Sequence, residues 1–283
     1  MRFAKMHGLG NDFVIINGFS EKISDDLSAL AKSACHRQLG IGADGLIVLT
    51  PAEKGIAAVF NYYNADGSRA EMCGNGLRCA ALFAKKEGIV DDNKFTLQTL
   101  GGLVQIVIED EQKGIVSVDM GQPRLNPAEI PARFSGNPVI GAPLTVQEQI
   151  YSVTLVSMGN PHCVIFVENI ADFPVDKVGA QIEIDEHFPA KTNVEFIQLL
   201  TKEKIAMRVW ERGCGETLAC GSGACAAVVA SVLNGYTKNK VSVYLQHGVL
   251  QVEWAENRHV LMTGSATLVA RGDYFVQIAN NNS

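Results

Sequence analysis

The sequence lacks long apolar runs and clusters of basic residues, and each absence excludes a class of protein. No stretch approaches the roughly 20 apolar residues that a membrane span needs, and the first residues hold neither an apolar core nor a small-residue cleavage site. The formal net charge is −6, without the concentrated Lys and Arg that neutralise nucleic-acid phosphates. We therefore expect a cytoplasmic globular protein that binds a small molecule and neither a membrane nor a nucleic acid.

Disulfide and metal motifs are missing as well. The chain has seven cysteines, an odd number that fits poorly with a closed disulfide framework, and it has no Cys-x-x-Cys pair. The spacing of Cys214, Cys220 and Cys225 also differs from that of zinc motifs. We expect reduced thiols, no metal and no cofactor.

The sequence does contain an internal repeat, which is best sought before any other pattern. Aligning Cys73 with Cys220 places Cys-Gly-Asn-Gly over Cys-Gly-Ser-Gly. Other blocks follow in the same order at almost the same offset: 59–64 over 206–211, Asn11 over Asn160, Asp44 over Asn193, and 102–106 over 248–252. We therefore expect an α+β fold of two pseudo-symmetric domains from an internal duplication. Each domain is expected to be a β-sheet or barrel around a central helix, with an active site in the interdomain cleft.

Local signals place the main elements of each repeat. Helices are predicted over 74–86 and 221–233, before the stop signals at Gly88 and Asn234-Gly235, and an amphipathic helix is predicted directly after Asp26. Strands are predicted at 59–64 and 206–211. The stretch 122–143 carries five prolines, a composition typical of an interdomain crossing. We place the two repeats at 1–120 and 121–265.

The repeated Cys-Gly-x-Gly turn predicts a chemical site. A thiol at the N-terminus of a helix lies beside unpaired backbone N–H groups, which favour the thiolate and lower its pKa toward neutrality. The backbone of Gly74, Asn75, Gly221 and Ser222 could bind a carboxylate at the same helix ends. Two such thiols on opposite faces of one α-carbon could remove its proton and return another, which inverts an amino acid without a cofactor.

Plainer interpretations apply to several of these residues. A free Cys is usually a small buried hydrophobe, and we assign that role to the five other cysteines: Cys35, Cys79, Cys163, Cys214 and Cys225. His162 could tune a thiol or cap a turn, and Glu211-Arg212 could be a surface ion pair. The asparagines Asn11, Asn64, Asn160 and Asn193 could simply shape turns. We favour ligand contact because Asn11 and Asn160 are repeat equivalents, as are Asn64 and Glu211.

Six blocks of the sequence resemble the diaminopimelate epimerase family across essentially the whole chain. They are 5–13 (KMHGLGNDF), 64–68 (NADGS), 73–76 (CGNG), 158–163 (MGNPHC), 211–217 (ERGCGET) and 220–223 (CGSG). The chain departs from some members at Gly45, where they have Gln.

The resemblance implies interconversion of LL- and meso-2,6-diaminoheptanedioate, a step toward lysine and peptidoglycan, by an isomerase without a cofactor. It implies Cys73 and Cys220 as the acid and base, His162 and Glu211 as modulators of the thiols, and a homodimer. It also implies that a C-terminal strand, at about 266–283, returns to the first domain. The implied substrate contacts are Asn11, Asn64, Gly74, Asn75, Asn160, Asn193, Glu211, Arg212, Gly221 and Ser222. A proline racemase or hydroxyproline epimerase of the same fold, and a non-catalytic duplicated binding protein, remain alternatives.

Overall fold

The structure, a computed structural model, describes residues 1–23, 25–70 and 72–275. The contacts within the chain divide it into two units. Unit 1 is Met1–Val118 together with the segment from Ser265 onward, and unit 2 is Asp119–Gly264.

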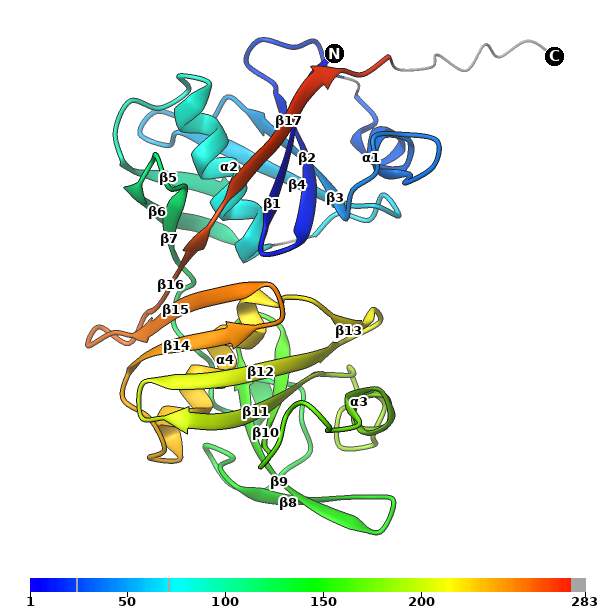
Figure 1. The fold of residues 1–283 in the computed structure, drawn as a ribbon, viewed down its shortest axis with the longest axis vertical. Coiled ribbons are helices and arrows are strands. Elements are labelled where there is room, and N and C mark those ends of the chain that lie inside the picture. Colours follow the sequence, from blue (N-terminus) through cyan, green and yellow to red (C-terminus); the bar gives the residue numbers. More distant parts are fainter. Residues whose placement is uncertain (24, 71, 276–283) are drawn as a thin grey trace, which may run out of the picture. The chain divides into compact units, whose positions relative to one another are not determined.

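Unit 1 is a sheet whose strands are hydrogen-bonded in the order β17-β1-β2-β3-β4-β5-β6-β7. Figure 1 shows β17, in red, running beside β1. The strands are β1 (Arg2–Gly8), β2 (Asn11–Asn17), β3 (Gly45–Thr50), β4 (Ala58–Asn64), β5 (Lys94–Thr99), β6 (Gly102–Asp110), β7 (Ile115–Asp119) and β17 (Thr267–Asp273). The last part of the expected C-terminal strand, 276–283, lies outside the described residues.

The central strands of unit 1 are buried because helices cover both faces. Val14, Ile16, Leu46 and Val48 of β2 and β3 pack against α1 (Leu27–Cys35). The alternate side chains of these parallel strands point to the other face, where α2 (Gly74–Lys86) packs against both strands. All α2 residues from Gly74 to Ala84 are buried, so α2 is the central helix of the unit.

Unit 2 repeats this arrangement. Its strands pair in the order β8-β9-β10-β11-β12-β14-β15-β16, with β13 on the edge of β12. The strands are β8 (Ala142–Val146), β9 (Gln149–Ser157), β10 (Pro161–Phe166), β11 (Asn193–Thr201), β12 (Lys204–Glu211), β13 (Gly215–Thr217), β14 (Lys240–Leu245), β15 (Gly248–Trp254) and β16 (Val260–Ser265).

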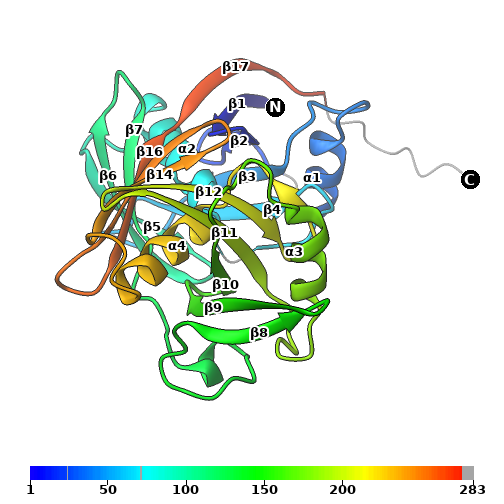
Figure 2. The same ribbon diagram turned by 60° about the horizontal axis from the view of Figure 1, so that its bottom comes forward.

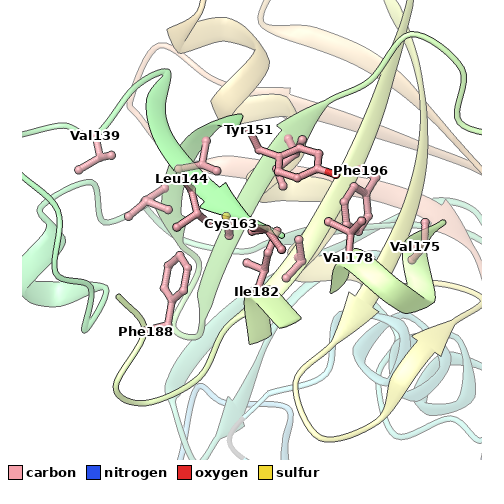
Figure 3. Packing of buried hydrophobic residues seen from close by; sticks show 14 of the residues in the cluster. Val139, Leu144, Tyr151, Cys163, Val175, Val178, Ile182, Phe188 and Phe196 are labelled. Carbon is pink, nitrogen blue, oxygen red and sulfur yellow. The ribbon is translucent and has the colours of Figure 1, made fainter. Parts of the chain in front are cut away.

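Two helices cover the sheet of unit 2 as α1 and α2 cover that of unit 1. Helix α3 (Val175–Glu183) closes an apolar core with β9, β10 and β11, which Figure 3 shows in close-up. Helix α4 (Gly221–Leu233) packs against β9, β10, β11, β14 and β15 (Figure 2). Of its 13 residues only Ser222, Val232 and Leu233 are not buried, which is typical of a helix surrounded by protein.

The two sheets match strand for strand. In both units the seven successive pairings are antiparallel, antiparallel, parallel, antiparallel, parallel, antiparallel and antiparallel. Strand β17 therefore takes in unit 1 the place that β8 takes in unit 2. The predicted duplication and α+β class are confirmed, and so are the predicted bounds of α2 and α4.

Two expectations need correction. The proline-rich stretch is not an interdomain crossing: it holds η1 (Pro127–Glu129), and its residues Ile130 and Val139 belong to the core of unit 2. Figure 3 shows Val139 in this core. The repeat alignment also slips by one residue at β11. Strand pairing sets Asn193 opposite His162 and Gly45 opposite Phe13, so Asn193 is the counterpart of Gly45 and not of Asp44.

Candidate active site

Cys73 caps the N-terminus of α2 in unit 1. Its backbone is extended, with φ −145° and ψ 107°, and its Sγ accepts a hydrogen bond from the Gly76 N–H at 3.4 Å. The strand geometry at Cys73 and the helix that starts at Gly74 together direct the thiol toward the unpaired N–H groups of the first turn. The side chain is half-buried, so the sulfur keeps access to a ligand.

A chain of amides links Cys73 to a buried arginine. Sγ lies 3.7 Å from Asn11 Oδ1, which also accepts from Asn75 Nδ2 at 3.1 Å. Asn75 Oδ1 accepts from Arg78, whose side chain is fully buried. Asn11 Nδ2 donates to Asp44 at 2.8 Å. The structure thus brings Cys73, Asn11, Gly74 and Asn75 together, and their roles in catalysis and substrate binding stay predictions.

Asn64 ends β4, the strand before the Cys73 loop. Its Oδ1 accepts from the Tyr62 hydroxyl at 2.9 Å, and its Nδ2 donates to Ser68 at 2.9 Å. Tyr62 also accounts for Gly45, because a Cβ at Gly45 would lie 2.5 Å from the Tyr62 ring and 2.7 Å from the Tyr63 carbonyl oxygen. The ring fills the space that a side chain at position 45 would need.

Cys220 caps α4 in the same extended conformation, with φ −118° and ψ 111°, but it is 5 % exposed. We expected the helix end to lower its pKa. Instead, burial raises the pKa of the Cys220 thiol well above its ordinary value, and the carboxylates of Glu211 and Glu195 raise it further. The Ser222 hydroxyl, 3.6 Å from the sulfur, acts in the opposite direction.

A second chain of side chains links Cys220 to a buried carboxyl group. Asn160 Nδ2 donates to the Ser222 Oγ at 3.3 Å, and Asn160 Oδ1 lies 2.9 Å from His162 Nε2. His162 Nδ1 lies 2.7 Å from Glu195 Oε1, and both side chains are fully buried. His162 thus reaches Cys220 through Asn160 and Ser222.

Glu195 is a residue that the sequence reasoning missed. It lies near the start of β11, in an otherwise apolar run, Val194-Glu195-Phe196-Ile197. Its counterpart in unit 1 is Ile47, and a charged residue opposite an isoleucine in the repeat was the available signal. Burial raises the pKa of Glu195, and the neighbouring His162 limits that rise.

The remaining predicted residues of unit 2 surround the loop after β12. Glu211 accepts from the Thr217 hydroxyl, and Asn193, 4 % exposed, accepts from the Arg212 N–H at 3.0 Å and donates to the Pro161 carbonyl. The Arg212 guanidinium is exposed and donates to the Ala190 carbonyl at 3.1 Å. Asn193 therefore shapes the backbone of this loop, and its role as a substrate contact stays a prediction.

The other cysteines fall into two groups. Cys35, Cys79, Cys163 and Cys225 are buried as expected, and burial raises the pKa of Cys35 and Cys79 to about 12. Cys214 is exposed, contrary to our expectation, because it lies in the turn between β12 and β13. Within residues 1–23, 25–70 and 72–275, no group of three or more His, Cys, Asp or Glu side chains could hold a metal ion. No helix in the same ranges is long and apolar enough to cross a membrane.

Comparison with known proteins decides the family. The model of the diaminopimelate epimerase family matches residues 3–126 and 154–269, which include both cysteine-capped helices. The chain belongs to the diaminopimelate epimerase family. A diaminopimelate epimerase from Moorella thermoacetica is 48% identical over 277 residues, 97% of this chain and 99% of the relative. One from Methanococcus maripaludis is 45% identical over 278 residues, with 96% and 99% covered.

Solved structures show the same fold at low sequence identity. A probable proline racemase from Agrobacterium radiobacter K84 matches with a TM-score of 0.70 at 14% identity, covering 99% of this chain and 94% of that one. A hydroxyproline epimerase from Agrobacterium vitis matches with a TM-score of 0.68 at 15% identity, with 96% and 91% covered. The diaminopimelate epimerase family thus shares its two-unit architecture with enzymes named for other substrates.

Proposed function

We propose that this chain interconverts LL- and meso-2,6-diaminoheptanedioate by transferring the α-proton of one stereocentre between two thiols. The observation that carries the proposal is the duplicated cap: in each unit of a diaminopimelate epimerase family member, a cysteine begins the central buried helix. The reaction serves lysine and peptidoglycan precursor synthesis. The odd number of cysteines, seven, fits reduced thiols, and we place the activity in the cytoplasm.

Each step of the mechanism balances without a cofactor. One cysteine, as thiolate, takes the α-proton, so that an S–H bond forms as the C–H bond breaks. The other cysteine, as thiol, gives its proton to the opposite face of the same carbon. Charge that builds on the substrate carboxylate is stabilised by the N–H groups at the two helix ends, Gly74-Asn75 and Gly221-Ser222. The thiols exchange protonation states in each turnover, so the raised pKa of Cys220 suits it to the thiol role first.

The other predicted residues suit the ends of a long substrate with two ammonium and two carboxylate groups. The exposed Arg212 guanidinium can pair with the distal carboxylate, and Glu211 with an ammonium group. The amides of Asn11, Asn64 and Asn160 can accept from ammonium groups and donate to carboxylates.

Deuterium exchange tests the proposal. In D2O, with the reduced protein present, diaminopimelate should take up deuterium at its α-carbon as the LL and meso forms interconvert. Mass spectrometry measures the deuterium, and chiral chromatography measures the two forms. Proline and hydroxyproline are assayed in parallel. Deuterium exchange into proline alone would show that the substrate is proline. Exchange into none of the three amino acids would favour the non-catalytic binding protein.

Serine variants test the two-thiol mechanism. Cys73→Ser and Cys220→Ser should each lose at least about 100-fold in the rate of epimerisation, because a hydroxyl at ordinary pKa is a poor base. Cys214→Ser, which changes an exposed thiol outside both caps, is the matched control and should keep full activity. Full activity in either cap variant would refute the mechanism.

A further inference from the structure

The two cysteines are supported by different side chains, although the units share one architecture. In unit 1, Phe13 of β2 and Ile47 of β3 lie on the faces that point to α2. The Cδ1 of Ile47 would lie 3.2 Å from a Cβ at Gly76, in the first turn of that helix. In unit 2, His162 of β10 and Glu195 of β11 take the same two positions beneath α4. The Oε1 of Glu195 would lie 2.7 Å from a Cβ at Gly223, in the first turn of α4. A fully apolar pair is thus replaced by a fully buried polar pair beneath one helix only.

The contacts of the pair determine where its protons lie. His162 Nε2 faces Asn160 Oδ1, which can only accept, so Nε2 carries a proton. The contact of 2.7 Å between His162 Nδ1 and Glu195 Oε1 needs one proton between them, whichever group holds it. The pair therefore has no net charge, and Glu195 keeps His162 in the form that donates from Nε2. Among the residues that the structure describes, Glu195 Oε2 has no hydrogen-bond partner, so the contact of Oε1 with His162 is what accounts for this carboxyl group.

The form of His162 that donates from Nε2 fixes the side-chain orientation of Asn160, and Asn160 in turn contacts Ser222 beside the Cys220 sulfur. Because Asn160 Oδ1 accepts from His162, its Nδ2 points to the Ser222 Oγ. The Cys220 Sγ lies 3.6 Å from the same Oγ, and either atom could be the donor of this contact. When Cys220 is a thiolate it can only accept, so the Ser222 hydroxyl is then the donor. In unit 1, by contrast, the sulfur of Cys73 faces the side-chain oxygen of Asn11, which can only accept, and it also accepts from the Gly76 N–H.

We propose that Glu195 is a positioning residue for Cys220, acting through His162, Asn160 and Ser222 to hold a hydroxyl donor against the thiolate of this cysteine. The proposal rests on the proposed epimerase function for its kinetic effect, but the reactivity of the Cys220 thiol reports on it without substrate. It assigns Glu195 no contact with substrate.

Three variants test the proposal. His162→Phe with Glu195→Ile places the apolar pair of unit 1 in unit 2, and Glu195→Met alone keeps the length of the side chain. Glu195→Gln is the conservative variant, because its amide N–H can donate to His162 Nδ1 and keep the proton on Nε2. Glu253→Gln, which removes a half-buried carboxylate from β15 of the same unit, is the control. Replacing a buried polar pair by well-packed apolar groups is often neutral for stability, and circular dichroism and melting curves show which apolar variants fold.

The kinetic readout separates positioning from binding. A folded apolar variant should lose about 10- to 100-fold in kcat for diaminopimelate epimerisation, with a smaller change in KM, because the hydroxyl donor to the Cys220 thiolate is no longer held in place. Glu195→Gln should recover most of this loss, and Glu253→Gln should match the unchanged protein. Impairment of Glu195→Gln as severe as that of the apolar variants would overturn the proposal, as would an effect on KM alone.

The alkylation readout uses Cys73 as an internal reference. Iodoacetamide labelling at a fixed pH, followed by peptide mass spectrometry, gives the rates at Cys73 and Cys220 in the same molecules. Because the Glu195 carboxylate itself raises the pKa of Cys220, the apolar variants are compared with Glu195→Gln, which also lacks that charge but keeps the donor. Loss of the donor should slow Cys220 relative to Cys73 about tenfold against Glu195→Gln. An equal ratio in Glu195→Gln and a folded apolar variant would overturn the proposal. If the unchanged protein fails to exchange deuterium, the proposed function fails, while this ratio still decides the role of Glu195.

Discussion

Two glycines, Gly76 and Gly223, occupy the same position in the first turn of the two central helices, three residues after each cysteine. Neither has a positive φ, so space and not backbone strain determines what each position tolerates. Beside Gly76 the nearest atom to an added Cβ is a flexible methyl group of Ile47. Beside Gly223 the nearest atoms are the Glu195 carboxylate oxygen at 2.7 Å, the Cys220 Cβ at 3.2 Å and the Cys220 sulfur at 3.3 Å.

Alanine at these positions should therefore have unequal effects. Gly223→Ala should push Glu195 from His162, lowering the rate of epimerisation at least about tenfold and the free energy of unfolding by about 1–3 kcal/mol. Gly76→Ala should change both little, because Ile47 can adjust and alanine favours a helix by up to about 1 kcal/mol. Deuterium exchange and urea unfolding measure the two effects. Equal losses in both variants would contradict the packing difference between the units.

Strands β1 and β2 and the segment before β3 are joined by a cluster of charges that also holds Asn11. Asp12 pairs with Lys5 at 2.5 Å and with Arg37 at 2.9 Å, and Arg37 also pairs with Asp44. Burial alone would raise the pKa of Asp12, but the hydrogen bonds from Arg37 and Lys5 outweigh it and lower the pKa to about 2. The cluster fixes Asp44, which accepts from the Asn11 amide.

Asp12→Asn should destabilise the protein in a pH-dependent way. A carboxyl group whose pKa is lowered on folding stabilises the native state fully above its unfolded pKa of about 4, and that stabilisation is lost as pH falls toward 2. We expect a loss of about 1–2 kcal/mol near neutral pH, after allowance for solvent screening of the exposed Arg37. Urea unfolding at neutral pH and at about pH 3 should show the difference from the unchanged protein shrinking with acid. A constant difference would contradict the ionic origin.

Local signals predicted the elements better than the contacts between them. Helices α2 and α4 were predictable because each begins at a Cys-Gly-x-Gly turn and ends before a glycine signal. The register of β11 was not predictable. Aligning Asn193 with Asp44 or with Gly45 changes the repeat by one residue, and the aligned blocks on either side read equally well in both cases. Glu195 was missed because its burial depends on His162 and Gly223, which are distant in the sequence.

At the scale of the molecule, unit 1 is assembled from two distant parts of the chain. Strand β17 pairs with β1 from Asp273 opposite Arg2 to Thr267 opposite His7. The repeat accounts for seven strands in each unit, whereas the return of the last strand was implied only by the family resemblance. Pairing between such distant segments depends on contacts that neither segment signals by itself.

Removing β17 should damage unit 1 selectively. A chain that ends after Ala266 would expose the edge of β1, which carries the buried side chains Ala4 and Met6. Limited proteolysis with mass spectrometry should find cleavage within residues 1–118 at least about tenfold faster than in the full chain, because local opening exposes cleavable sites. Cleavage within 119–264 should keep its rate, which serves as the internal control. Equal protection of both units would show that β17 adds nothing to unit 1.

The position of β17 also bears on the order in which the protein is made. A domain normally folds during synthesis once its own residues have left the ribosome, and the first domain normally leads. Here residues 119–264 hold the strands of unit 2, whereas the first 118 residues must wait for β17, which is translated only after all of unit 2. The half that carries Cys220 can therefore mature before the half that carries Cys73, and an interrupted translation product would hold only one finished thiol cap.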